Sequence, residues 1–192
     1  MSAEQAKPKR TAADLARHAE EFMQAREFGA CLYLCDLAVA EDPYDPLSYY
    51  VRGRCLNTVG RLEEALAPLA RATELAPDRA DVQGAYAQAL DDADHLSQAY
   101  KHYTRAMQLD PDLVDLLVGR ASVRLRLGDF KGALGDVDAH LAQRPRSVEA
   151  LVLRGCCHLA GGRREQARQD FDRVIALEPG QRERVERLTR GL

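Results

Sequence analysis

Most prolines of this chain recur at one constant interval. The prolines that keep this interval are Pro43, Pro77, Pro111, Pro145 and Pro179. A proline cannot continue the interior of a helix, because it lacks an N–H donor and its ring clashes with the preceding turn. A helix-breaking residue at a period of about 34 residues predicts a tandem array of similar units, each built from helices.

Residues of defined size keep the same interval. Twelve residues before each proline stand Cys31, Ala65, Ala99, Ala133 and Ala167, and twenty-four before stand Ala19, Gly53, Ala87, Ala121 and Gly155. Larger residues such as Leu69, Tyr103 and Phe171 stand eight before. Small residues allow two helices to approach closely, and a large residue fills the space beside them. Gly60, Gly128 and Gly162 stand seventeen before and predict a turn between the two helices of a unit.

This pattern resembles the tetratricopeptide repeat family, whose repeat has the same period of about 34 residues. The second repeat carries the family's pattern as Tyr49, Arg52-Gly53, Leu56, Ala65, Leu69, Ala72 and Pro77. The resemblance covers about residues 12–181 and implies an all-α fold, an α-solenoid of five helix-turn-helix repeats with a C-terminal capping helix. The expected boundaries are a disordered N-terminal tail at 1–11, repeats at 12–45, 46–79, 80–113, 114–147 and 148–181, and a capping helix at 182–192.

Composition narrows the class of protein. There are 27 Lys plus Arg against 30 Asp plus Glu, a formal net charge of −3, which argues against nucleic acid as a partner. No apolar run approaches the length of a membrane span. The first ten residues are polar and contain no apolar region of a secretory signal. An odd number of cysteines, five, without an export signal favours a reducing compartment, so we expect a cytoplasmic protein with free thiols. The oligomeric state stays open.

Catalytic motifs are absent from the sequence. There is no phosphate-binding loop, no nucleophile elbow and no H-E-x-x-H pair, so we expect no catalytic residues, no cofactor and no enzyme. Cys31 and Cys35 share a helix face near His18, which leaves a metal or redox sensor as an alternative. Both cysteines also occupy core positions of the repeat, where a thiol behaves as a small hydrophobe. Core packing is therefore the preferred interpretation, and no metal ligand is predicted.

The resemblance implies a concave groove, lined by the first helix of each repeat, that binds an extended peptide or a partner helix. The polar residues predicted to contact the partner are Tyr50, Arg54, Asn57, Asp81, Gln88, Asp91, Asp92, Asp115, Ser122 and Arg126. The acidic residues among them favour a protein partner with a segment that carries basic residues. An apolar strip of Val118, Leu125, Val152 and Leu159 is expected to be exposed near the C-terminal end.

One subclass of the family is disfavoured. Its co-chaperones hold a C-terminal carboxylate with Lys, Arg and Asn side chains, but the matching positions here hold Ala16, Glu20, Val51, Asp81 and Ala85. The preferred hypothesis is a non-catalytic scaffold or adaptor that binds proteins in the groove. The alternative is a structural subunit or assembly factor of a larger complex, and the second alternative is the cysteine-based sensor.

Overall fold

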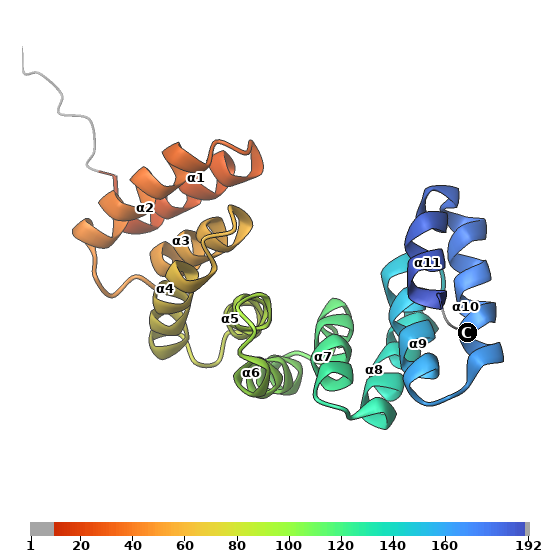
Figure 1. The fold of residues 1–192 in the computed structure, drawn as a ribbon. Helices are drawn as coiled ribbons and strands as arrows, with labels where there is room; N and C mark the ends of the chain where they lie inside the picture. The colour runs from red at the N-terminus through yellow and green to blue at the C-terminus, as the bar shows by residue number, and fades with distance from the viewer. Residues whose placement is uncertain (1–9, 191–192) are drawn as a thin grey trace, which may run out of the picture. The chain divides into compact units, whose positions relative to one another are not determined.

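The computed structural model describes residues 10–190, and every regular element in that range is helical (Figure 1). The helices are α1 Ala12–Gln24, α2 Phe28–Glu41, α3 Pro46–Thr58, α4 Leu62–Leu75, α5 Ala80–Asp92, α6 Leu96–Leu109, α7 Asp115–Arg126, α8 Phe130–Gln143, α9 Val148–Ala160, α10 Arg164–Leu177 and α11 Arg182–Thr189. A 3₁₀ turn, η1, covers Pro179–Gln181. The predicted all-α fold of tandem helix pairs is confirmed, and α11 is the capping helix.

The turns between the two helices of a repeat contain glycine where the sequence predicts it, and the repeats without this glycine have the same turn. Gly60, Gly128 and Gly162 have φ values of 80°, 84° and 72° and end the first helix of their repeats. The same turn position in the first and third repeats holds Arg26 and Asp94, whose φ values of 63° and 66° are also left-handed. The turn geometry is thus the same in all five repeats, although only three of them place glycine where this backbone is least strained.

The N-terminal prediction lies largely outside the part of the chain that the structure describes. Residues 1–9 of the predicted tail are not described. Thr11 begins α1 as its N-cap, accepting a hydrogen bond from the backbone of Asp14, whose carboxylate accepts one in return from the Thr11 backbone. This capping box explains why the first helix starts at Ala12.

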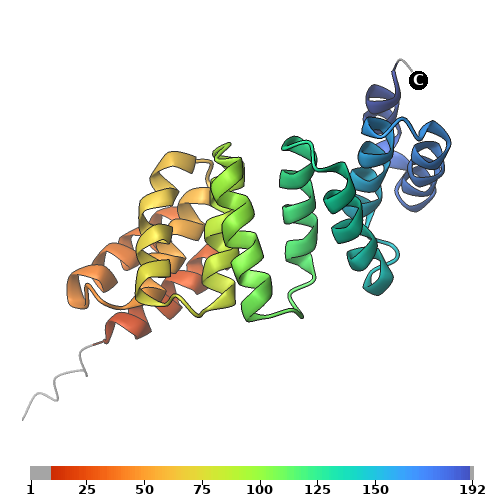
Figure 2. The ribbon, with the colours of Figure 1, turned by 90° about the horizontal axis from the view of Figure 1, so that it is seen from below.

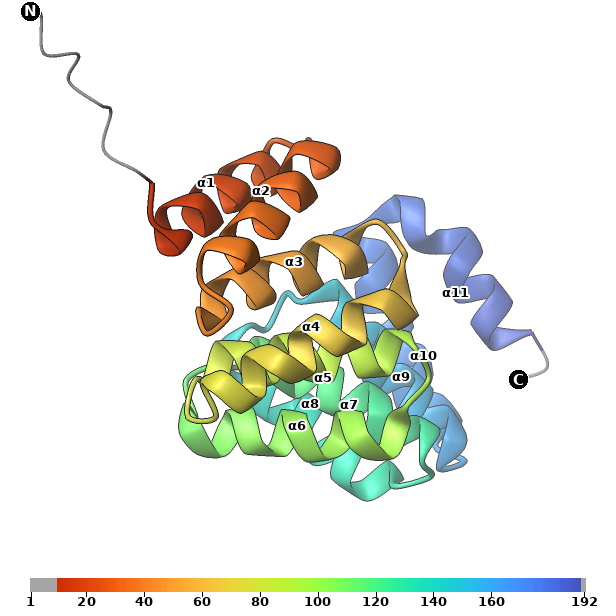
Figure 3. The same cartoon turned by 90° about the vertical axis from the view of Figure 1, so that its left-hand side faces the viewer.

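The chain divides into two compact units, Met1–Ala93 and Asp94–Leu192, and the division falls between the two helices of the third repeat. Unit 1 contains α1 to α5 and unit 2 contains α6 to α11. In unit 1 each helix lies beside its neighbour in the chain, as Figures 2 and 3 show for α1 to α4. The first helices α1, α3 and α5 also contact one another, and in unit 2 α7 contacts α9.

The core of unit 1 packs small residues against large ones, as predicted. A side chain at Gly53 would place its Cβ 2.4 Å from Cγ of Leu69, so only glycine lets α3 and α4 approach this closely. Leu69 is fully buried, and so are Cys31, Cys35 and Cys55. The prediction that Cys31 and Cys35 pack in the core is confirmed.

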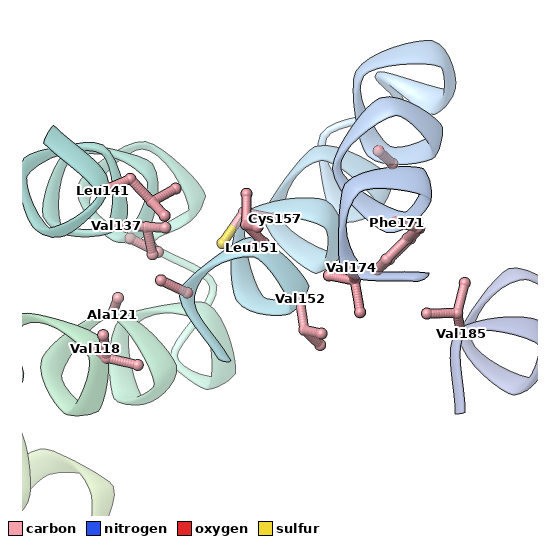
Figure 4. Close-up of a cluster of buried hydrophobic side chains, with 13 residues drawn as sticks. Val118, Ala121, Val137, Leu141, Leu151, Val152, Cys157, Phe171, Val174 and Val185 are labelled. Atoms are coloured by element: carbon pink, nitrogen blue, oxygen red, sulfur yellow. The ribbon is translucent and has the colours of Figure 1, made fainter. Parts of the chain in front are cut away.

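The core of unit 2 repeats this packing (Figure 4). A Cβ on Gly155 would lie 2.6 Å from the ring of Phe171, which is buried between α9 and α10. Val185 of α11 joins the same cluster, so the capping helix is anchored by one apolar side chain. The expected exposed apolar strip is wrong, because Val118 and Val152 are buried in this cluster while Leu125 and Leu159 pack against it.

Two buried aspartates that pair with arginines distinguish unit 2. Arg120 donates to both oxygens of Asp136, with N···O distances of 2.9 and 2.6 Å, and Arg154 does the same to Asp170 at 2.8 and 2.6 Å. Asp136 and Asp170 are buried. Each pair links the two helices of one repeat, because the arginine lies on the first helix and the aspartate on the second.

Candidate protein-binding surfaces

The predicted contact residues divide between the two units. Seven of them lie on α3 and α5 of unit 1, and Asp115, Ser122 and Arg126 lie on α7 of unit 2. In unit 1 the helices α1, α3 and α5 lie side by side, and we call the surface they form the first-helix face of unit 1.

Tyr50 and Arg54 are joined on the first-helix face of unit 1. The guanidinium carbon of Arg54 lies 5.1 Å from the centre of the Tyr50 ring, and Arg54 Nη1 is 3.3 Å from the tyrosine oxygen. Arg54 also pairs with Glu20 of α1 at 3.1 Å. The Tyr50 ring is buried and has a second cation beside it, Arg79, at 5.6 Å. Burial raises the pKa of the Tyr50 hydroxyl. The tyrosine is therefore a structural support for Arg54 rather than an exposed contact.

Arg79 was missed by the sequence analysis. It is the last residue of the second repeat and caps the start of α5, so its sequence position indicated a loop rather than the face of a helix. A guanidinium within about 6 Å of a buried aromatic ring is held there by a cation–π interaction. No repeat pattern could reveal this contact, because the corresponding residue differs in every other repeat.

Asn57, Gln88 and Asp92 form a second group on the same face. Asn57 Nδ2 donates to Asp92 Oδ2 at 2.7 Å, which links α3 to α5, and Gln88 Nε2 donates to Asp92 Oδ1 at 3.0 Å. Asp92 is exposed, and within the described residues no cation pairs with it. Two neutral amides thus orient the carboxylate and leave its full negative charge facing solvent.

The predicted acidic character of this region is only partly present. Asp81 pairs with Arg79, and these contacts lower the pKa of Asp81 against the opposing effect of its burial. Asp91 is buried and does not face solvent. Of the predicted acids in unit 1, Asp92 is the one that is exposed and that no cation pairs with among the described residues.

In unit 2 the predicted residues are more dispersed. Asp115 pairs with Arg144 at 2.7 Å, and Arg126 pairs with Asp94. Ser122 is half-buried on the same helix. Asp115 and Arg126 thus pair with residues outside the predicted set, whereas Asn57, Gln88 and Asp92 of unit 1 bind one another.

The cysteines do not form a metal site in the described part of the chain. No group of three or more His, Cys, Asp or Glu side chains is placed to hold a metal there. His18 stacks on Phe22 with ring centres 5.1 Å apart, while Cys31 and Cys35 are fully buried. Burial and the neighbouring thiol raise the pKa of Cys55 to about 12, which makes it a poor nucleophile and a poor ligand. The sensor alternative gains no support.

Family models support the assignment that the repeat pattern implies. Two tetratricopeptide repeat models match, one over residues 47–79 and the other over residues 118–182, together about half of the chain. The chain belongs to the tetratricopeptide repeat family. The family and the fold support a protein-interaction scaffold.

Relatives in the tetratricopeptide repeat family match part of the chain. Tetratricopeptide repeat protein 36 of Danio rerio is 35% identical over 86 residues, which cover 43% of this chain and 46% of that protein. DnaJ homolog subfamily C member 7 of Mus musculus is 30% identical over 82 residues, 43% of this chain and 17% of the relative. RNA polymerase II-associated protein 3 of Mus musculus is 34% identical over 82 residues, 43% of this chain and 12% of the relative. The matches therefore span less than half of each relative.

Solved structures agree on the fold. A crystal structure of MamA has a TM-score of 0.76 and 16% identity, covering 90% of this chain and 94% of that one. A crystal structure of YrrB, described as a tetratricopeptide repeat protein with an unusual peptide-binding site, has a TM-score of 0.76 and 20% identity over 88% of this chain and 87% of that one. In the described residues no helix is both long and apolar enough to cross a membrane.

Proposed function

We propose that this chain is a non-catalytic adaptor that binds a segment of a partner protein on the first-helix face of unit 1. The contact residues would be Arg54, Asn57, Gln88 and Asp92, and the buried Tyr50 ring would hold the Arg54 guanidinium in place. A segment with a lysine or arginine opposite Asp92 would complete the charge pattern of this face.

The observation that carries this proposal is that the Asp92 carboxylate is oriented by its neighbours but not paired with a cation among the described residues. The amides of Asn57 and Gln88 hold this carboxylate in place. A carboxylate that is already oriented loses little conformational entropy when it binds, so it is well suited to receive an ammonium or guanidinium group. Asp81, at the other end of α5, is already paired with Arg79 and is less available.

Recovery of partners from the native cell, followed by binding measurements on the purified pair, tests the proposal. Asp92→Lys should weaken binding at least about tenfold, because it replaces an attraction with a repulsion, and Asp92→Asn should weaken it about threefold. Affinity should also fall as the salt concentration rises.

Glu63→Lys is the matched control. Glu63 is an exposed acid on α4, a second helix, and its reversal changes the net charge of the protein by the same amount. It should leave the affinity unchanged. Equal affinity of the wild type and the Asp92→Lys variant for the partner would move the binding surface elsewhere.

An apolar stripe on α2 favours the alternative of a structural subunit. Tyr33 and Leu37 are 63% and 40% exposed, and Tyr44 beyond the helix is 72% exposed. The corresponding residues of the second repeat are Ala67, Arg71 and Asp78, so this exposed group is not repeated there. Apolar side chains that share one exposed helix face often contact another protein.

The mass of the protein in solution separates the two functions. If α2 packs in a complex, the wild type should migrate as an oligomer or with a bound protein, and a Tyr33→Glu, Leu37→Glu variant should migrate alone. An unchanged elution of the wild type and the variant, both monomeric at high protein concentration, would reject the alternative while leaving the adaptor proposal intact.

A further inference from the structure

A cavity opens on unit 2 between the start of α7, the end of α8 and the loop that leads into α9. It measures about 530 Å³ and is lined by the apolar side chains of Val118 and Pro145 and by His140, Arg146 and Glu149. Ser147, the N-cap of α9, also lines it. Arg144 and Asp115 line it as an ion pair, so their charges cancel.

The second repeat indicates what can fill such a space. Val118 is the fifth residue of the fourth repeat, and the fifth residue of the second repeat is Tyr50. The Tyr50 ring is buried beside Arg79, which immediately precedes α5 just as Ser147 immediately precedes α9. Thus the chain itself places an aromatic ring next to the start of the following helix in one repeat, and leaves a cavity beside a smaller valine in another.

His140 adds a hydrogen-bonding requirement to this cavity. The residue is only 3% exposed, and its Nδ1 lies 2.9 Å from the carbonyl oxygen of Val114. A carbonyl oxygen can only accept, so Nδ1 carries the proton, and in the tautomer with this single proton Nε2 is an acceptor. Within the described residues Nε2 has no hydrogen-bond partner. A buried acceptor without a donor is unfavourable, so a ligand whose donor reaches it would bind more tightly.

We infer that this cavity binds an aromatic side chain that carries an N–H or O–H donor, a tryptophan or tyrosine of the partner protein. The ring would contact Val118 and Pro145 and lie near the guanidinium of Arg146, and its donor would reach the buried Nε2 of His140 after the side chains that cover this atom move aside. Phenylalanine offers a similar ring but leaves Nε2 unpaired. The inference depends on the proposed function only for the source of the ring, since the cavity can be tested without a partner.

N-acetyl-tryptophanamide is the first probe. The chain contains no tryptophan, so the fluorescence of the indole reports on the ligand alone and should shift to shorter wavelength on binding. We expect a dissociation constant of about 0.1–1 mM for so small a ligand. In ¹H–¹⁵N spectra the amides of Val118 and Ser147 should shift, and so should the Nε2 resonance of His140.

N-acetyl-phenylalaninamide is the matched probe without a donor, and it should bind about threefold to tenfold more weakly. His140→Leu should remove this difference by weakening the indole probe to the affinity of the phenyl probe. Val118→Tyr should abolish binding of both, because it fills the cavity as Tyr50 does in unit 1. Ala160→Tyr adds the same ring at an exposed position of α9 and should leave both affinities unchanged.

The outcomes separate the two proposals. Asp92→Lys should not change binding of either probe, so a failure of the unit 1 surface would leave this result intact. Equal affinity for the indole and phenyl probes, or an indole affinity unchanged in His140→Leu, would overturn the assignment of the donor to His140. No shift at Val118 or Ser147 up to about 10 mM indole probe would overturn the aromatic site itself. The melting temperature of each variant checks that it folds.

Discussion

Tyr50 in unit 1 and Val118 in unit 2 hold the same place in their repeats and produce opposite surfaces. The tyrosine ring is buried with two arginines beside it, whereas the valine borders a cavity. The helices around them are similar, because both repeats have small residues at the same positions and the same turn. The comparison shows that the repeat determines the backbone while a single side chain determines whether a site is filled or open.

A second difference lies between the helices of each repeat. Unit 2 places the aspartates Asp136 and Asp170 there, each bound to an arginine of the first helix. The corresponding residue of the second repeat is Pro68, which is buried, and its arginine, Arg52, instead pairs with Asp36 at the surface. The second repeat therefore depends on apolar packing where the fourth and fifth repeats depend on buried ion pairs.

The largest expected effect tests that difference. Arg154→Met leaves the buried carboxylate of Asp170 without its bidentate partner and should lower the free energy of unfolding of unit 2 by about 3–5 kcal/mol. Urea unfolding followed by circular dichroism measures the loss. Arg52→Met, which breaks the exposed pair with Asp36, should cost less than about 1 kcal/mol. Equal losses in the two variants would contradict the contrast between the units.

Tyr50→Val tests the first comparison directly. It gives the second repeat the side chain that the fourth repeat has, and it should cost about 2–3 kcal/mol, since it removes a buried ring and leaves a cavity. Thermal unfolding measures the loss, and binding of N-acetyl-phenylalaninamide to unit 1 tests whether the new cavity accepts a ring. A loss no larger than that of an ordinary surface substitution, about 0.5 kcal/mol, would mean that the ring contributes little to the packing of α3.

The buried thiols make the stability of the folded protein depend on pH in the alkaline range. Burial and the neighbouring Cys31 raise the pKa of Cys55 from about 9 in an unfolded chain to about 12 in the folded protein. The folded state therefore keeps the proton that the unfolded state loses, so stability is complete below pH 9 and decreases between pH 9 and 12. The decrease reaches about 1.4 kcal/mol per pH unit for each such thiol.

Unfolding in urea at pH 8 and pH 10 checks this dependence. Cys55→Ala should lessen the decrease, because alanine has no proton to lose. Replacement of Cys156, which is only half-buried, should affect it less. A decrease that is the same in the wild type and in Cys55→Ala would assign the alkaline loss to other groups.

The smallest effect concerns the turns. Arg26→Gly should stabilise unit 1 by about 1 kcal/mol, because Arg26 has a left-handed backbone that glycine adopts without strain. Gly128→Arg should destabilise unit 2 by a similar amount, although no neighbouring atom would obstruct the new Cβ. Thermal unfolding measures both. An unchanged or lower stability of Arg26→Gly would mean that contacts of the arginine side chain outweigh the strain.

Much of the fold could be predicted from the sequence. The proline interval predicted where the helix pairs end, and the small residues such as Gly53 and Gly155 predicted close contacts that the structure confirms. The burial of Cys31 and Cys35 also followed from their places in the repeat. The exposed strip was wrong because Val118 and Val152 pack into the core of unit 2, and repeat position alone does not reveal how much of a side chain its neighbours cover.

The candidate sites could be predicted less well. The sequence placed Tyr50 and Arg54 on adjacent turns of one first helix and Asp92 on the next first helix. It did not indicate that Arg79 stacks on Tyr50 or that two amides orient Asp92, because these contacts depend on how side chains are placed in space. His140 was absent from the prediction, since a histidine in a core position indicates packing and not an unpaired acceptor.

The sequence by itself determined the repeat, the helix pairs and the turns between them, because these follow from local backbone preferences and from a regular pattern of residue size. The tertiary structure alone decided which carboxylates have a cation beside them and where a cavity remains. Those properties depend on the distances between side chains that are far apart in the chain, and a regular repeat period constrains the backbone but not those distances.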